Sequence, residues 1–393
     1  MSLRSDIAAM PRPVWVLFAG TLVNRFGTFV LVFLALYLTG KGFTAPQAGL
    51  AMGAYGGGAI GASIVGGWLA DHIGRRNSIV LSMVLSAAVM LAFPSAEGYA
   101  VLLALAMLAG FCAELYRPAA AALIADVTAP AQRVTAYALY RLAINMGFAI
   151  GPAVGGFLAE RSFTFLFVAD AATSLVYAAI ALFALPNRAG DHHASMPRRA
   201  ALPVILRDTR FLLFIGSTLM ASTVFMQHVS SYPLQVKAYG YTSAVFGMLI
   251  SMNGVIICLT ELPLTAYTRR RSARRVMMAG LVIIGAGFAM TAFVSSIPLL
   301  VTSVAIWTFG EMLYFPMASA HIANLSPPDM RGRYHGAWGI AWGLGAVLGP
   351  IGGTSLFARD PRLVWLAAAA LAGLGALLVV PGTRPEREAR PAI

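Results

Sequence analysis

Charged side chains interrupt long apolar stretches of this sequence, among them Arg25, Glu114, Arg141, Asp170, Glu261 and Glu311. The stretches around them are long enough to cross the hydrocarbon core of a membrane, which needs about 20 helical residues. A charged side chain that faced lipid there would cost several kcal/mol, so each must face an aqueous cavity or another charge. Their chemistry would be the binding of a charged substrate or the transfer of a proton. Asp170 and Glu261 lie nearer the helix ends and are weaker candidates for it than the other four.

Four of these charges are expected at a similar depth in the membrane. With a helical rise of about 1.5 Å per residue, Arg25, Glu114, Arg141 and Glu311 lie roughly 15 to 20 Å from one membrane surface, near the bilayer centre. We expect Glu114 and Arg141 to form an ion pair, because their helices are antiparallel neighbours. A proton carrier must take up and release a proton as its surroundings change, and Glu114 and Glu311 are the candidates. For Glu114, a static ion pair that fixes helix packing is the alternative.

The composition is that of an integral membrane protein. Apolar residues make up 59% of the chain, charged residues 11%, and the mean hydropathy is +0.77. A soluble domain with this composition would have too little polar surface to face water. We predict an all-α fold with twelve transmembrane helices, at 13–38, 44–70, 77–95, 99–125, 132–159, 163–185, 210–236, 243–267, 275–293, 297–322, 332–357 and 362–381.

The formal net charge of +13 is distributed unevenly among the predicted loops. Arginines gather in one alternate set of loops, which includes Arg75, Arg133 and the run 269–271. The opposite set holds only Lys41, Arg161, Lys237, Arg359 and Arg362. The positive-inside rule then places both termini and the central loop in the cytoplasm. The basic charge therefore orients the chain without a nucleic acid partner, and anionic membrane lipid is its expected neighbour.

The sequence repeats itself at an offset of 198 residues, so that Asp126 of the first copy matches Asn324 of the second. In this register Gly151-Pro152 lies over Gly349-Pro350. Each copy holds an even number of predicted crossings, so the copies are parallel repeats, a pattern typical of transporters with a site between their halves. We predict a first six-helix bundle at 1–185, a cytoplasmic linker at 186–209, a second bundle at 210–381 and a disordered tail at 382–393.

A short charged turn follows the second predicted helix, with the sequence Gly67-Trp68-Leu69-Ala70-Asp71-His72-Ile73-Gly74-Arg75-Arg76. Its acid and arginines are close enough in sequence to pair, and Gly74 relaxes the backbone of the turn. The turn resembles the signature that major facilitator superfamily transporters carry between helices 2 and 3. The resemblance implies the fold of that family, and it makes Asp71 and Arg75 a latch for the outward-facing state. In related exporters an acid at the end of helix 4 joins this latch, a role that falls to Asp126.

The fifth predicted helix carries a run of small residues and a proline: Gly147, Gly151, Pro152, Gly155 and Gly156. Glycines at intervals of four make a groove for close helix approach, and the proline bends the helix. The run resembles the signature of the family's antiporters, which implies proton-driven export. Alternatively, it serves packing alone, because the eleventh helix repeats part of it. The arginine that the family carries in helix 4 is absent, since Ala106 stands in its place.

These observations predict a secondary active transporter of the drug:proton antiporter type. It would export small amphipathic or drug-like molecules as a monomer in the bacterial inner membrane. The candidate residues for its cavity wall, which in membrane helices more often pack or face lipid, are Phe29, Phe33, Tyr37, Met226, Gln227, Trp307, Tyr314 and Phe315. The alternative is import or exchange of a polar metabolite, such as a sugar, an organic anion or an amino acid. Arg25 and Arg141 would hold the anion. Nothing in the sequence indicates the nucleophile or phosphate cradle of an enzyme, and we expect no metal or cofactor.

Overall fold

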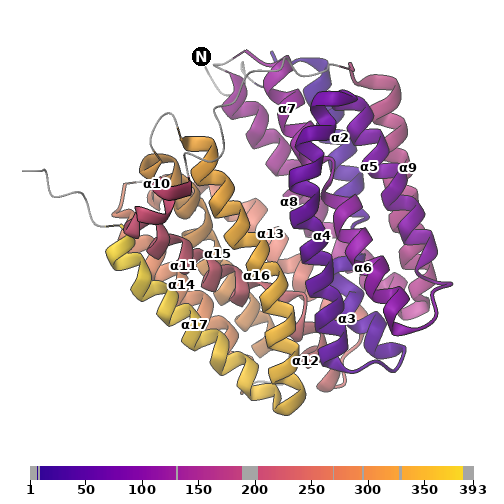
Figure 1. Ribbon diagram of the computed structural model, residues 1–393. Helices are drawn as coiled ribbons and strands as arrows, with labels where there is room; N and C mark the ends of the chain where they lie inside the picture. Colours follow the sequence, from indigo (N-terminus) through magenta and orange to yellow (C-terminus); the bar gives the residue numbers. More distant parts are fainter. Residues whose placement is uncertain are drawn as a thin grey trace, which may run out of the picture. The chain divides into compact units, whose positions relative to one another are not determined.

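The computed structural model describes Ile7 and residues 9–129, 132–187, 202–268, 270–293, 296–326 and 330–383, and their regular secondary structure is helical (Figure 1). The helices are α2 (Arg12–Phe26), α3 (Val30–Gly40), α4 (Ala45–His72), α5 (Arg75–Ala92), α6 (Tyr99–Glu114), α7 (Arg117–Val127), α8 (Arg133–Arg161), α9 (Phe163–Ala184), α10 (Leu202–Arg207), α11 (Thr209–Phe225), the 3-10 helix η3 (Met226–His228), α12 (Ser231–Ala238), α13 (Ser243–Thr268), α14 (Ala273–Met290), α15 (Ile297–Leu325), α16 (Arg331–Arg359) and α17 (Pro361–Gly382). Within the described ranges, twelve helical stretches are long and apolar enough to cross a membrane. The predicted all-α fold with twelve crossings is confirmed.

Three crossings that we predicted as continuous helices are interrupted. The first divides into α2 and α3, the fourth into α6 and α7, and the seventh into α11, η3 and α12. Pro118 lies in the first turn of α7, where a residue without a backbone N–H starts a helix but cannot continue one. Near the third break, Gln227 Oε1 accepts the hydroxyls of Ser230 and Ser231 at 3.3 and 2.7 Å. Hydrogen bonds between these side chains therefore stabilise the irregular backbone at this break.

The chain packs as two compact units, and each is described here by itself. Unit 1 consists of Met1–Ala194, Gln227–Leu259 and Ala346–Asp360. Unit 2 consists of Ser195–Met226, Thr260–Gly345 and Pro361–Ile393. Most of the predicted linker and nearly all of the predicted tail lie outside the described residues, at 188–201 and 384–393. The predicted domain boundaries stay a prediction.

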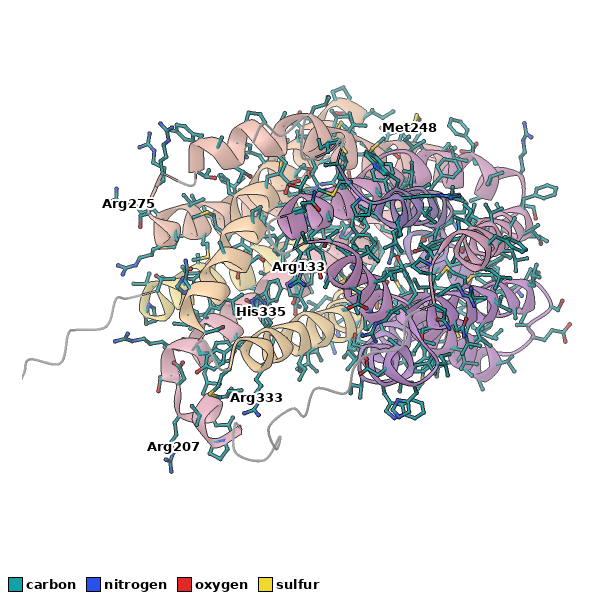
Figure 2. All side chains as sticks on the ribbon, turned by 90° about the horizontal axis from the view of Figure 1, so that it is seen from above. Arg133, Arg207, Met248, Arg275, Arg333 and His335 are labelled. Carbon is teal, nitrogen blue, oxygen red and sulfur yellow. The ribbon has the colours of Figure 1, made fainter. Side chains whose placement is uncertain are left out.

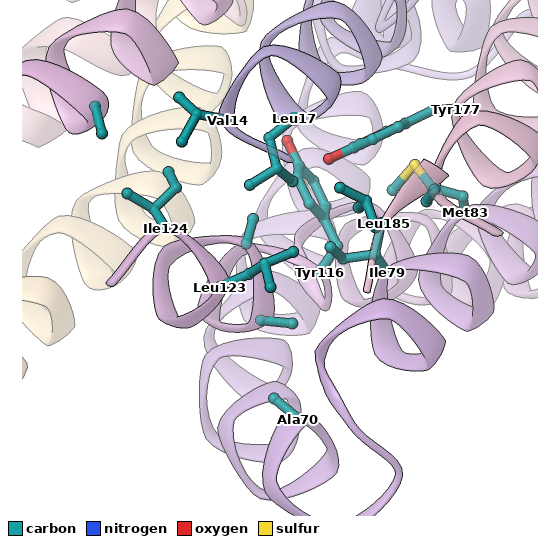
Figure 3. Close-up of a cluster of buried hydrophobic side chains, with 14 of the residues drawn as sticks. Val14, Leu17, Ala70, Ile79, Met83, Tyr116, Leu123, Ile124, Tyr177 and Leu185 are labelled. Atoms are coloured by element: carbon teal, nitrogen blue, oxygen red, sulfur yellow. The ribbon is translucent and has the colours of Figure 1, made fainter. Parts of the chain in front are cut away.

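Unit 1 is built around the helices of the first half of the chain. In it α2 packs against α8 and α9, α4 against α6, and α5 against α9. A buried apolar cluster joins these helices at the end that carries the charged turn (Figure 3), with Leu17, Ile79, Tyr116, Leu123 and Tyr177 among its members. Lipid tails are as apolar as these side chains, so close packing rather than exclusion of water stabilises such contacts in a membrane.

At its other end, unit 1 includes segments from the second half of the chain. A side chain at Gly49 of α4 would overlap Thr354 and Pro350 of α16. A side chain at Gly156 of α8 would overlap the backbone at the start of α13, where Ala244 N donates to Glu160 Oε1 at 3.1 Å. Within unit 1, segments of α13 and α16 thus pack closely on α8 and α4 at the end remote from the charged turn.

Unit 2 repeats the helical packing with its own helices. Here α14 packs against α15 and α17, and α11 packs against α17. Phe288 stacks on Trp307 and on Trp365, with ring centroids 5.4 and 6.1 Å apart. Tyr334 OH donates to Asp208 Oδ2 at 3.0 Å, which brings the beginnings of α11 and α16 together. Arg207, Arg275 and Arg333 point away from the helices of this unit (Figure 2).

Candidate functional site

The charged turn after α4 forms an ion-pair cluster inside unit 1. Arg75 Nη1 donates to Asp71 Oδ1 at 2.5 Å, and Arg75 Nε donates to Asp126 Oδ2 at 3.3 Å. The arginine side chain is 10% exposed, whereas Asp71 is 50% exposed. Gly74 precedes α5 with a φ of +89°, a conformation that favours glycine. Gly74 therefore makes the turn, and the first residue of α5 reaches both acids.

The other residues of the predicted turn have separate surroundings. Arg76 Nε donates to Asn77 Oδ1 at 3.3 Å rather than to an acid. A Cβ at Gly67 would meet no atom within 4 Å, so this glycine leaves an open surface on α4. His72 Nδ1 donates to the carbonyl of Trp68 at 2.8 Å, and the two rings stack.

The glycines of α8 form two contact surfaces. Side chains at Gly147 and Gly151 would overlap the Arg25–Phe26 backbone of α2, and one at Gly155 would overlap Phe29 and Phe33. On the other surface, Gly247 approaches the carbonyl of Pro152 so closely that a Cβ there would overlap it. Residues of the predicted antiporter run therefore contact both the break in the first crossing and the start of α13.

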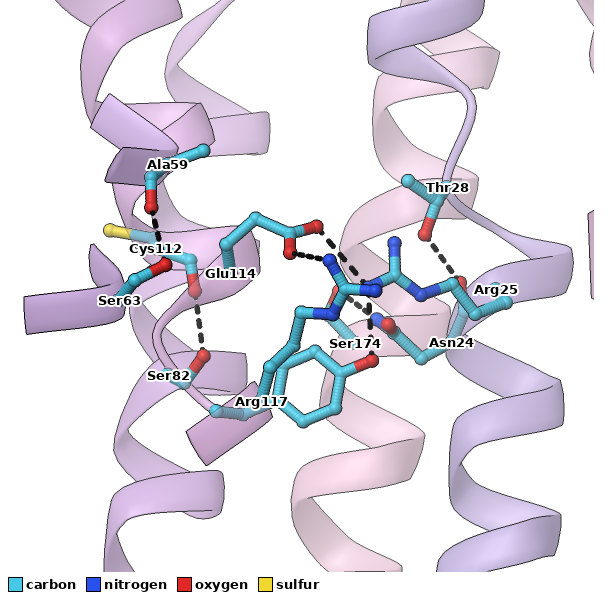
Figure 4. Close-up of polar contacts among 11 residues, drawn as sticks. Asn24, Arg25, Thr28, Ala59, Ser63, Ser82, Cys112, Glu114, Arg117 and Ser174 are labelled. Carbon is cyan, nitrogen blue, oxygen red and sulfur yellow. Dashed lines mark hydrogen bonds and ion pairs between the residues drawn. The ribbon is translucent and has the colours of Figure 1, made fainter. Parts of the chain in front are cut away.

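A second charged cluster lies where α6 ends and α7 begins (Figure 4). We call it the central cluster, and it consists of Arg25, Glu114, Tyr116 and Arg117. Arg25 Nη2 donates to Glu114 Oε1 at 3.2 Å and to the hydroxyl of Tyr116 at 3.1 Å. Arg117 Nη1 donates to Glu114 Oε2 at 2.6 Å. The side chains of Arg25 and Glu114 are 12% and 15% exposed, and that of Arg117 is 52% exposed. Two arginines thus converge on one carboxylate.

The expected ion pair between Glu114 and Arg141 is wrong. Glu114 is held by Arg25 from α2 and by Arg117 from the start of α7. Arg141 lies on an exposed face of α8. The spacing of three residues between Glu114 and Arg117 was a local signal for one of the two pairs. The contact with Arg25 had no such signal, because 89 residues separate it from Glu114.

Asp170, which we had rated a weaker candidate, holds the break in the first crossing. Its Oδ2 accepts the backbone N–H of Phe29 at 3.2 Å, just before α3 begins. The residue is 4% exposed, and the described residues form no ion pair with it. A carboxylate at a helix N-terminus is stabilised by the free N–H groups there. Asp170 therefore couples α9 to the break between α2 and α3.

The other predicted candidates lie in the second unit or in packed positions. Glu311 is half-buried in α15 and belongs to unit 2, as does Glu261. The aromatic residues proposed for a cavity wall are well packed: Phe29, Phe33, Tyr37, Trp307 and Tyr314 are at most 5% exposed. Phe33 and Tyr37 make ring contacts with Phe246 and Phe167. These contacts favour the packing interpretation of the aromatic residues.

The profile of the Major Facilitator Superfamily matches residues 17–250 and 229–393. The chain belongs to this family. The MFS-type transporter YqjV of Bacillus subtilis is 29% identical over 86% of this chain and 85% of its own length. The multidrug resistance protein MdtH of Aeromonas salmonicida is 26% identical over 93% and 94%. A Na(+), Li(+), K(+)/H(+) antiporter of Planococcus maritimus is 26% identical over 74% and 77%.

Solved transporter structures share this fold. The crystal structure of the nucleoside transporter NupG superposes with a TM-score of 0.79 at 16% identity, covering 94% of this chain and 100% of that one. This superfamily transporter is therefore a multi-pass bacterial membrane protein and not an enzyme.

Proposed function

We propose that this protein is a proton-coupled antiporter that exports small amphipathic molecules by alternating access. The observation that carries the proposal is the contact between the antiporter-like glycines of α8 and the break in the first crossing. Through Gly147 this contact reaches the backbone of Arg25, whose side chain binds Glu114. A shift of α8 would therefore move a charge of the central cluster directly. The names of two relatives, a multidrug resistance protein and a cation/proton antiporter, support the same activity.

We assign the proton to carboxylates inside the spans. Glu114 and Glu311 are the candidates from the sequence, and the geometry adds Asp170. An ionised carboxylate that is buried without a cationic partner is costly, so Asp170 is well placed to exchange a proton when the helix break opens to water. Glu114, between two arginines, keeps its charge more easily and suits a binding or positioning role.

The latch role belongs to Asp71, Arg75 and Asp126. Alternation needs contacts that hold one state and are released in the other. The cluster is only partly buried, so its ion pairs can be exchanged for water at a modest cost. We further propose that this end of the helices faces the cytoplasm, because the arginine-rich loops lie there.

Everted inner-membrane vesicles test the export proposal. A preformed pH gradient, acid inside, is followed with a fluorescent amine, and a test compound is then added. An exporter coupled to protons releases protons as it loads the compound, so the fluorescence recovers. Vesicles without the protein serve as the control. Absence of recovery for a panel of cationic, neutral and anionic amphipaths would contradict the proposal.

Import or exchange of a polar metabolite is the second candidate, and one observation favours it. The central cluster holds two arginines against one carboxylate, an arrangement that suits an anionic substrate better than a cationic drug. Right-side-out vesicles separate the two functions, since an importer would accumulate a labelled organic anion in them when an inward proton gradient is imposed.

A further inference from the structure

The central cluster contains more hydrogen-bond donors than acceptors. An arginine side chain carries five N–H groups and a carboxylate carries two acceptor oxygens. Arg25 and Arg117 share the single carboxylate of Glu114. Within the part of the chain that the structure describes, the Nε of Arg25 and the hydroxyl of Tyr140 are buried without a hydrogen-bond partner. Buried donors without acceptors are rare in proteins, and an acceptor that entered this site would satisfy both of these groups.

Tyr140 lies on α8, the helix that Arg25 approaches at Gly147. It also packs against the buried apolar cluster that includes Tyr116 and Tyr177. The central cluster therefore has arginines on one side and aromatic rings on the other, which suits the binding of an amphipathic anion.

The net charge of the central cluster is positive, so it favours the same kind of ligand as the surplus of hydrogen-bond donors does. With Glu114 ionised, two arginines and one carboxylate leave one positive charge. The cluster also lies at the N-terminus of α7, an 11-residue helix whose first N–H groups add partial positive charge. A cation would have to compete with two arginines for Glu114, whereas an anion would remove the surplus. One of the arginines, Arg117, is 52% exposed and so can be reached.

We propose that Arg25, Arg117 and Tyr140 bind a carboxylate of the transported molecule, and that Glu114 occupies N–H groups of the two arginines until the substrate displaces it. The planar carboxylate matches the fork of a guanidinium and accepts two parallel hydrogen bonds. The alternative is a static triad that only joins the first crossing to the fourth. This proposal names the substrate class of the transporter proposed above and so rests on that function.

Equilibrium binding to the purified full-length protein tests the site without transport. Three probes share one aromatic body: naphthaleneacetate, its neutral amide and naphthylmethylammonium. We expect the acid to bind at least about tenfold more tightly than the amide, since a charge-assisted pair contributes about that factor. The Glu114→Gln variant should bind the acid more tightly than the wild type, because the internal competitor has lost its charge. A static triad would instead lose stability without gaining affinity.

Substitution of Arg117 should change the affinity for the acid in the opposite direction to Glu114→Gln. Arg117→Gln should weaken binding of the acid by about tenfold and leave the amide unchanged. Its half-exposed side chain makes misfolding a small risk, and the melting temperature of each variant checks this. Arg161→Gln, an exposed arginine at the end of α8, is the matched control and should bind like the wild type. Arg117→Lys should restore part of the affinity.

Several results would overturn the proposal. They are equal affinity for acid and amide, no saturable binding of the acid to either the wild type or Glu114→Gln, and preferential binding of the cation that disappears in Glu114→Gln. The result of the vesicle assay is independent of the result of the binding assay. Acid binding with the expected pattern but no proton movement would contradict proton coupling alone. Proton movement without the pattern would contradict the carboxylate site alone.

Discussion

At the scale of single residues, the charges inside the first unit are stabilised by partners from distant parts of the chain. Arg25 is the central example: its side chain binds Glu114 and Tyr116, and its backbone lies against Gly147. A lone charge at that depth would cost several kcal/mol, and the ion pair of Arg25 with Glu114 offsets part of this cost. The same residue is therefore part of the binding chemistry and of the helix packing.

Asp170 provides the first prediction at this scale. Asp170→Asn keeps an oxygen acceptor for the N–H of Phe29, so the break in the first crossing should remain and the protein should fold. The amide cannot exchange a proton. We expect proton-driven transport to fall by more than about tenfold, while counterflow of substrate without a proton gradient continues. Equal loss of both activities would contradict a role in coupling.

The second prediction at this scale concerns Arg75. Arg75→Lys should slow transport about tenfold, because one ammonium cannot reproduce the directions in which the guanidinium reaches Asp71 and Asp126. Arg76→Lys is the control, since Arg76 contacts Asn77 and not an acid, and it should transport nearly normally. Initial rates in proteoliposomes with matched protein content measure the difference. Similar rates for the two variants would remove Arg75 from the latch.

At the scale of helices, close approach at glycines is the main packing device of unit 1. Gly151 of α8 lies against the carbonyl of Phe26, so even one added methyl group requires a backbone shift. Gly57 of α4 has no neighbour within 4 Å of the position a Cβ would take. Both glycines occur in helices long and apolar enough to cross a membrane, yet only one is required by a contact.

This difference gives a matched pair of substitutions. Gly151→Ala should lower the free energy of unfolding by about 1–3 kcal/mol, as overpacking does elsewhere. Gly57→Ala should be neutral or slightly stabilising, because alanine is the better helix former. Thermal unfolding in detergent, followed by circular dichroism, compares them. An equal effect of the two changes would mean that helix propensity, and not contact with α2, explains the role of Gly151.

At the scale of the whole molecule, segments of the second half pack with the first half at the end remote from Asp71. The hydroxyl of Ser251 in α13 accepts the backbone N–H of Ala153 in α8 at 2.8 Å. On the proposed mechanism this end must open during transport. The close contact therefore belongs to one of the alternating states.

A disulfide tests that requirement. In a protein from which Cys112 and Cys258 have been removed, Ala153→Cys with Ser251→Cys should form a cross-link on oxidation. Transport should then stop and recover after reduction, because the cross-linked end cannot open. Each single-cysteine variant serves as a control and should be insensitive to the oxidant. Undiminished transport by fully cross-linked protein would contradict opening at this contact.

Composition and periodicity were sufficient to predict the fold class and the number of crossings. A charge or a backbone polar group in hydrocarbon is so costly that twenty apolar residues in a row permit only one kind of structure. The short turn from Gly67 to Arg76 was also predictable in kind, since its acid and arginine are four residues apart. Local signals of this sort operate within a turn or two of helix.

The sequence by itself did not determine the breaks in the crossings or the partners of the buried charges. Glu114 could pair with any arginine at its depth, and only the packing of α2 against α8 selected Arg25 over Arg141. Asp170 likewise became significant only when α9 brought it to the break before α3. Hydropathy sets the depth of a side chain in the membrane, whereas the direction it faces and the neighbour it meets depend on the glycine contacts that fix how the helices are turned.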